Sequence, residues 1–131
     1  MAAYNSELIQ IIRSIDPKRP ISSGFSVPRP SAWHQAHCPL VGDCGPIAPG
    51  DSYWTSDSQQ QWRQQLAAQQ DGLDVWSIHT YPDDSDCFFP NSSSGDGSGS
   101  CANLTDVVRV AVEVAEAQNA VLYVGEYGGP G

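Results

Sequence analysis

Two short apolar runs that end in chemically active side chains constrain the fold of this chain most strongly. One run covers residues 73–78 and leads into His79 and Tyr81, and the other covers 121–125 and ends on Glu126. Nearly continuous β-rich runs of this length predict strands that are buried on both faces, as in a parallel sheet. Because α/β folds collect reactive groups at the carboxyl ends of parallel strands, we expect these three side chains to line one wall of a site.

Helical patterns alternate with the apolar runs. Apolar residues recur at helical spacing over about 6–16, 58–70 and 104–119. A weaker strand is predicted at 21–25, so the order of elements is α-β-α-β-α-β. Short turns precede the strands, and long excursions at 28–56 and 82–103 follow the first two. That asymmetry is typical of (β/α)8 barrels and of doubly wound sheets, and the pattern alone leaves both open.

The charge balance excludes one class of partner. A net charge of -9 and a pI near 4.3 argue against nucleic-acid binding, because such proteins usually carry a basic patch and the six cations here are scattered. No stretch approaches the roughly 20 apolar residues of a membrane span, so no membrane is expected as a partner. An acidic chain suits an uncharged or cationic substrate. We expect no cofactor.

The four cysteines fall into two local pairs. Cys38 and Cys44 bracket one polar loop, and Cys87 and Cys101 bracket another. This spacing predicts two loop-closing disulfides in an oxidising compartment, although four cysteines permit three connectivities. His34 and His37 beside the first pair offer a zinc set as an alternative, but the spacing matches no common zinc module, and we expect no metal.

Two glycosylation sequons strengthen the expectation of a secreted protein. They begin at Asn91 and Asn103, in and beside the second excursion. Residues 1–4 contain neither the basic nor the apolar region of a signal peptide. We therefore expect that residue 1 is not the natural start of the mature protein.

The three side chains at the strand ends have two interpretations. Glu126 lies between glycines that permit a sharp bend and close ligand approach, and a carboxylate held there is suited to act as the nucleophile of glycoside cleavage. His79 and Tyr81 alternate along a strand and project to one side, where they would orient Glu126. The structural alternatives are a Glu126 that is solvated or paired with an arginine, a hydrogen-bonded His79 and a packed Tyr81.

Aromatic side chains after the strands supply candidate sugar contacts. Trp33, Trp54 and Tyr127 are the predicted substrate-binding residues, and Phe88 and Phe89 occupy a similar loop position. Aromatic faces stack on sugar rings, but loop aromatics also serve simply to pack a loop against the core. Both interpretations stay open at this point.

Three segments in order resemble one family. Residues 13–24, 74–81 and 123–128 look like the passage from helix 4 to strand 5, strand 6 and strand 7 of clan A glycoside hydrolases, especially family 5 cellulases and mannanases. The resemblance implies a partial (β/α)8 barrel over residues 1–131, covering about strands 5 to 7. It also implies retaining hydrolysis of a β-1,4-linked polysaccharide, with Glu126 as nucleophile and with His79 and Tyr81 beside it.

The departures from that family leave two alternatives. The acid/base glutamate that follows an asparagine at strand 4 has no counterpart, since Glu7 lies in the first turn of a predicted helix. We therefore expect the isolated chain to be inactive and the remainder of the barrel to come from missing sequence. The alternatives are a non-catalytic carbohydrate-binding chain and a self-contained α/β domain.

Overall fold

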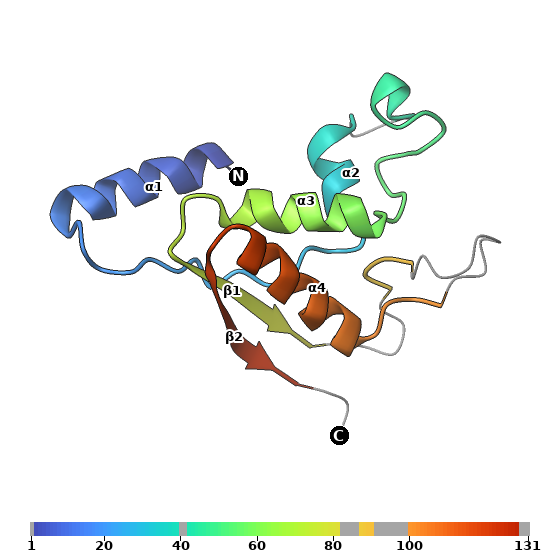
Figure 1. Ribbon diagram of the computed structural model, residues 1–131. Coiled ribbons are helices and arrows are strands. Elements are labelled where there is room, and N and C mark those ends of the chain that lie inside the picture. Colours follow the sequence, from blue (N-terminus) through green and yellow to red (C-terminus); the bar gives the residue numbers. More distant parts are fainter. Residues whose placement is uncertain (1, 40–41, 82–86, 91–99, 129–131) are drawn as a thin grey trace.

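The described part of the chain is a mixed α/β structure with a small parallel sheet. The computed structural model describes residues 2–39, 42–81, 87–90 and 100–128 (Figure 1). In chain order the elements are α1 (Ala2–Ile15), α2 (Ala32–His37), a 3-10 turn (Gly45–Ile47), α3 (Gln59–Gln70), β1 (Val75–Thr80), α4 (Leu104–Ala117) and β2 (Val121–Tyr127). The three longer helices confirm the helices predicted from the sequence, whereas α2 and the 3-10 turn were not predicted.

The core lies around a β1-α4-β2 unit. Helix α4 connects two parallel strands, which its length as a crossover permits. The buried face of α4 packs with Trp76 and Ile78 of β1 and with Trp62 and Leu66 of α3. Burying large apolar side chains of this kind stabilises a fold by about 1.5–3 kcal/mol each. The shared core holds the carboxyl end of β1 in a fixed position.

Local hydrogen bonds start the two helices around this core. Ser58 and Gln61 form a reciprocal capping box at α3, in which the Ser58 Oγ accepts from the Gln61 amide at 3.3 Å. Asn103 and Asp106 form the same motif at α4, with 3.0 Å from the Asp106 amide to the Asn103 Oδ1. Such caps are worth about 1 kcal/mol each.

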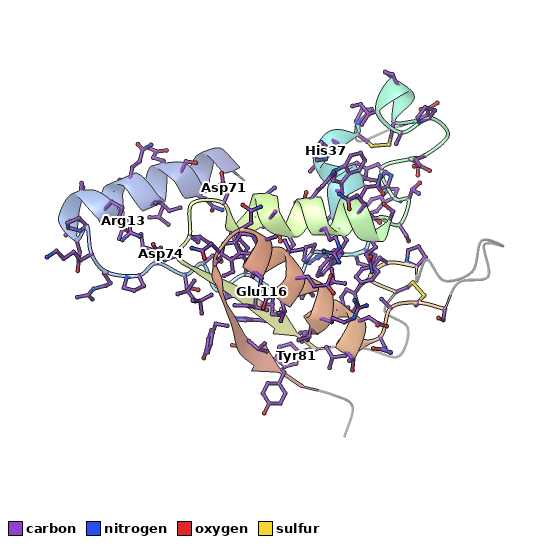
Figure 2. The ribbon with its side chains drawn as sticks, in the orientation of Figure 1. Arg13, His37, Asp71, Asp74, Tyr81 and Glu116 are labelled. Atoms are coloured by element: carbon purple, nitrogen blue, oxygen red, sulfur yellow. A yellow bond between two sulfur atoms is a disulfide. The ribbon has the colours of Figure 1, made fainter. Side chains whose placement is uncertain are left out.

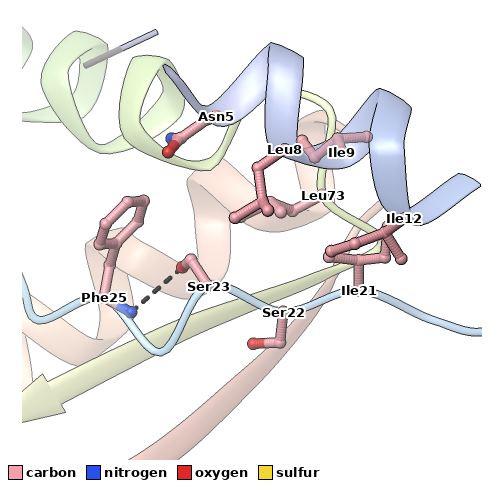
Figure 3. A pocket seen from close by; sticks show the side chains of 9 residues that line it. All are labelled: Asn5, Leu8, Ile9, Ile12, Ile21, Ser22, Ser23, Phe25 and Leu73. Carbon is pink, nitrogen blue, oxygen red and sulfur yellow. Dashed lines mark hydrogen bonds between the residues drawn. The ribbon is translucent and has the colours of Figure 1, made fainter.

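Helix α1 rests on the rest of the chain through a partly open apolar contact. Leu8, Ile9 and Ile12 face Ile21 and Leu73 around a hollow of about 330 Å³ (Figure 3). The ion pair of Arg13 with Asp74 and the 3.2 Å hydrogen bond from Asn5 to the Gln69 carbonyl tie its two ends. The outer face of α1 leaves apolar side chains exposed.

Residues 21–25 do not form the strand predicted for them. A single parallel bridge joins Ser22 to Val75. The physical reason is Gln70, whose buried carboxamide donates to the Ser77 carbonyl at 2.7 Å and accepts from the Ser77 amide at 3.4 Å. That side chain satisfies the polar groups of β1 that a neighbouring strand would otherwise take.

Strand β2 differs from the prediction of burial on both faces. Val121 is 65% exposed and Tyr123 is 58% exposed, whereas most of β1 is buried. Val121 and Tyr123 alternate with Leu122, which packs against the core, so they project from the opposite face, where no described element buries them. Within the described ranges β2 also has no strand on its other edge. The described residues therefore show a two-stranded sheet, and a partial barrel is not shown.

The excursion after residues 21–25 is ordered by tertiary contacts. The disulfide between Cys38 and Cys44 follows α2, and a second disulfide joins Cys87 to Cys101, so the predicted local pairing is confirmed. The buried Asp57 carboxylate accepts from two backbone amides at the start of α2.

Residues 82–86 and 91–99, which include Asn91, lie outside the described residues. No helix of the described chain is long and apolar enough to cross a bilayer.

Candidate functional site

The ends of the two parallel strands bring His79, Tyr81 and Glu126 together. His79 pairs with Glu126 and Thr80 with Tyr127 in the register of the sheet. The Tyr81 hydroxyl donates to the Glu126 Oε2 at 2.7 Å, and the His79 Nδ1 lies 3.8 Å from the same oxygen. Figure 2 shows Tyr81 at this end of the sheet. Three side chains selected from the sequence thus meet at one carboxylate.

A bulge in β2 sets this geometry. Ile78 pairs with Val124, but His79 pairs with Glu126, so Gly125 is the additional residue. A Cβ at Gly125 would lie 2.5 Å from the His79 Nε2 and 2.9 Å from its Cδ2. The absence of a side chain at Gly125 therefore allows the imidazole to lie against β2.

A second glycine makes room for the phenol. A Cβ at Gly128 would lie 2.7 Å from the Tyr81 Cδ1, and the Gly128 amide donates to the Thr80 carbonyl at 3.2 Å. Gly125 and Gly128 thus flank Glu126 and let two rings approach its carboxylate. The sequence already indicated glycines here, but not which side chain needed each of them.

The electrostatics of the site follow from the Tyr81–Glu126 hydrogen bond. That bond raises the pKa of the Tyr81 phenol above its ordinary value, because the phenolate would lie beside a carboxylate. Both side chains are exposed, so solvent screens the interaction. Within the described residues only Oε2 of Glu126 is hydrogen-bonded, which leaves Oε1 accessible to a ligand.

The backbone around His79 is fixed from the opposite side. Its carbonyl accepts from the Ser26 Oγ at 2.8 Å and from the Val27 amide at 3.2 Å. The His79 side chain is only 24% exposed. Ser26, Val27 and Arg29 join His79 and Tyr81 around a hollow of about 330 Å³, which Glu126 itself does not line. Sequence reasoning missed these contributions, since the irregular backbone at 26–29 has no motif to mark it.

The three predicted stacking residues lie on three different segments of the chain. Trp33 is part of α2 and stacks on His37, with ring centroids 4.4 Å apart. Trp54 is exposed and lies edge-on to Tyr53, and Tyr127 is exposed at the end of β2. None of the hydrogen bonds or ring contacts among the described residues joins Trp33 or Trp54 to Glu126.

Phe88, Phe89 and His34 have structural roles. Phe88 and Phe89 are buried in the core, which favours the packing interpretation of that loop. The buried His34 bonds through Nδ1 to the Asp57 Oδ1 at 2.6 Å. The cysteines near it are bonded to each other, so the alternative zinc set is wrong. Among the described residues no cluster of three or more His, Cys, Asp or Glu is placed to hold a metal ion.

Comparison of the chain with protein-family models, with curated proteins and with solved structures finds no match in any of the three. Inference about function therefore depends on the geometry of the site itself.

Proposed function

We propose that this chain forms the nucleophile-bearing wall of a retaining glycoside hydrolase that acts on a β-1,4-linked polysaccharide. The single observation that carries the proposal is the Glu126 carboxylate, bonded by the Tyr81 phenol at 2.7 Å and flanked by His79 at the carboxyl ends of parallel strands. Reactive groups of α/β enzymes gather at such strand ends. The chain would be about strands 5 to 7 of a (β/α)8 barrel whose other strands extend the β2 edge.

The arrangement suits one half of a double displacement. The Glu126 Oε1 attacks the anomeric carbon while Tyr81 holds Oε2, and a glycosyl ester forms as the bond to the leaving oxygen breaks. That oxygen needs a proton from a second carboxyl group about 5 Å from the first. Among the described residues no second carboxylate contacts the Glu126 site. The acid is therefore assigned to the rest of the proposed barrel.

Secretion of the parent protein is part of the proposal. Two disulfides support an oxidising compartment. Asn103, the first residue of one sequon, is exposed at the start of α4, where a glycan has access to solvent.

A non-catalytic carbohydrate-binding chain is the second candidate. Two observations favour it: no acid lies beside Glu126 in the described chain, and the exposed Trp54 and Tyr81 are free to present aromatic faces. Binding of oligosaccharide without any bond cleavage is the behaviour that this candidate predicts.

An aryl glycoside with an activated leaving group tests the enzymatic proposal, because 2,4-dinitrophenolate departs without acid assistance. We expect the folded chain to release one equivalent of dinitrophenolate from a β-cellobioside or β-mannobioside derivative. Glu126→Gln abolishes the release, and the matched change Glu116→Gln, at an exposed position on α4, leaves it intact (Figure 2). Equal release by both variants, or no release by the folded chain, contradicts the assignment.

A further inference from the structure

A larger groove lies next to the hollow that His79 and Tyr81 line. It measures about 810 Å³ and lies between residues 25–29, α2 and α3. Ser26, Val27 and Arg29 line both spaces, so this segment forms a common wall of the groove and the hollow. Figure 2 shows His37, which lines the groove, on the α2 side of the molecule, away from Tyr81. A ligand that extends from His79 and Tyr81 across residues 26–29 would therefore reach α3.

The groove contains polar groups that lack partners. Gln65 is only 7% exposed, lines the groove and makes no hydrogen bond to any described residue. The Oε1 of Gln69, one turn further along α3, is buried without a partner. Arg29 lies at the junction and makes no ion pair within the described residues. Buried polar groups are normally hydrogen-bonded, so the Gln69 Oε1 indicates a missing partner, and the Gln65 carboxamide, which bonds no described residue, lies along the same groove.

The chemistry of these groups selects the partner. A carboxamide donates and accepts hydrogen bonds, and sugar hydroxyls do the same. Gln35, Tyr53 and His37 add further polar groups along the groove. The net charge of -9 disfavours an anionic chain. The complement of the groove is a neutral, hydroxyl-rich ligand.

We propose that this polar groove, defined by Arg29, Gln65 and Gln69, binds the continuation of a neutral β-1,4-linked oligosaccharide whose end lies at Glu126. The position at Glu126 and the β-1,4 linkage rest on the proposed function, whereas binding of a neutral, hydroxyl-rich ligand in the groove does not. The groove therefore sets a requirement for chain length: a disaccharide occupies the Glu126 end alone, and a hexasaccharide reaches the α3 amides.

Titration calorimetry with β-1,4-linked gluco- and manno-oligosaccharides tests the requirement. The chain binds the hexasaccharide of one series at least tenfold more tightly than its disaccharide. Gln65→Leu and Gln69→Leu, at residues that line the groove but not the hollow, remove that advantage and leave disaccharide binding unchanged. The matched control is Gln64→Leu, at the exposed neighbouring position of α3, which alters neither affinity. Amide spectra and urea midpoints confirm that each variant is folded.

Three outcomes overturn the proposal: no preference for longer chains, an advantage that survives in folded Gln65→Leu and Gln69→Leu, or a preference for uronate-bearing over neutral chains. Failure of this proposal is distinguishable from failure of the proposed function. Release of dinitrophenolate that depends on Glu126, without any chain-length preference, refutes the groove alone. A preference that depends on Gln65, without release at Glu126, refutes the hydrolase alone.

Discussion

A single methyl group at Gly125 is expected to separate His79 from Glu126. The new Cβ of Gly125→Ala would lie 2.5 Å from the His79 Nε2 and 3.2 Å from the Tyr123 Cε1. These distances are too short for an unchanged structure, so the imidazole must move. Because the His79 side chain is 24% exposed, it has solvent into which to turn.

The magnitude follows from two opposing contributions to the free energy of unfolding. Overpacking at a well-filled position costs about 1–3 kcal/mol. Replacing glycine by alanine restricts the unfolded chain and returns about 0.4–1 kcal/mol where the backbone is compatible. The net effect is a loss of between about 0 and 2.6 kcal/mol, and most of the cost depends on the imidazole.

A double-mutant cycle with His79→Ala measures that dependence. Urea unfolding of the four proteins should give a coupling of about 1–3 kcal/mol between Gly125 and His79, because truncation of the ring removes the clash. In His79→Ala, only the 3.2 Å approach to Tyr123 opposes the new methyl. A coupling near zero, with Gly125→Ala equally harmful in both backgrounds, would refute the reasoning.

Two further changes test the packing around β1 and α1. Gln70→Leu should lower the free energy of unfolding by about 1–3 kcal/mol in urea melts, because it leaves the Ser77 amide and carbonyl buried without partners. The control is the same change at an exposed glutamine of α3, Gln64→Leu. Equal effects of the two changes would contradict the role of Gln70 as the hydrogen-bonding partner of Ser77. The Ile21 amide, and then the Arg13 guanidinium, lower the pKa of Asp74, so its stabilising contribution is present above the unfolded value of 3.8 and is lost as the pH falls through the lower folded value. The difference in urea midpoint between the wild type and Asp74→Asn should therefore begin to shrink as the pH falls below 3.8 and vanish only below the lower folded pKa of Asp74, and a difference that grows there contradicts it.

Local signals were sufficient to predict the long helices. Ser58 is followed three residues later by Gln61, which is the sequence signature of a capping box, and the structure forms both of its hydrogen bonds. Helix α2 lacked such a signal because its amides are capped by Asp57, more than twenty residues away. A cap supplied through tertiary structure has no local pattern.

The strands show the limit of periodicity. The run at 121–125 has the composition of a doubly buried strand, yet Val121 and Tyr123 are exposed because burial depends on neighbours that composition does not specify. Residues 21–25 do not pair as a strand because the Gln70 side chain takes the hydrogen bonds of Ser77 on that side of β1. Propensity scales do not describe such a side-chain contact.

The candidate site was predictable where chemistry and strand ends coincided. His79 and Tyr81 lie at the carboxyl end of one recognisable strand, and Glu126 lies near that of the other. The parallel pairing of the two strands then places the three side chains together. The groove was not predictable, because Arg29 lies in irregular backbone and Gln65 is one of many glutamines in α3. Only the fold distinguishes the buried amide of Gln65 from the exposed one of Gln64.

The most direct test of the central claim is the intact mass of the folded chain after incubation with 2-fluoro-glycosides that carry a highly activated leaving group. The account predicts a single covalent adduct, located on Glu126 by peptide mapping and absent from Glu126→Gln. An adduct on another residue, or no adduct on a chain shown to be folded, would contradict the assignment of Glu126 as a nucleophile.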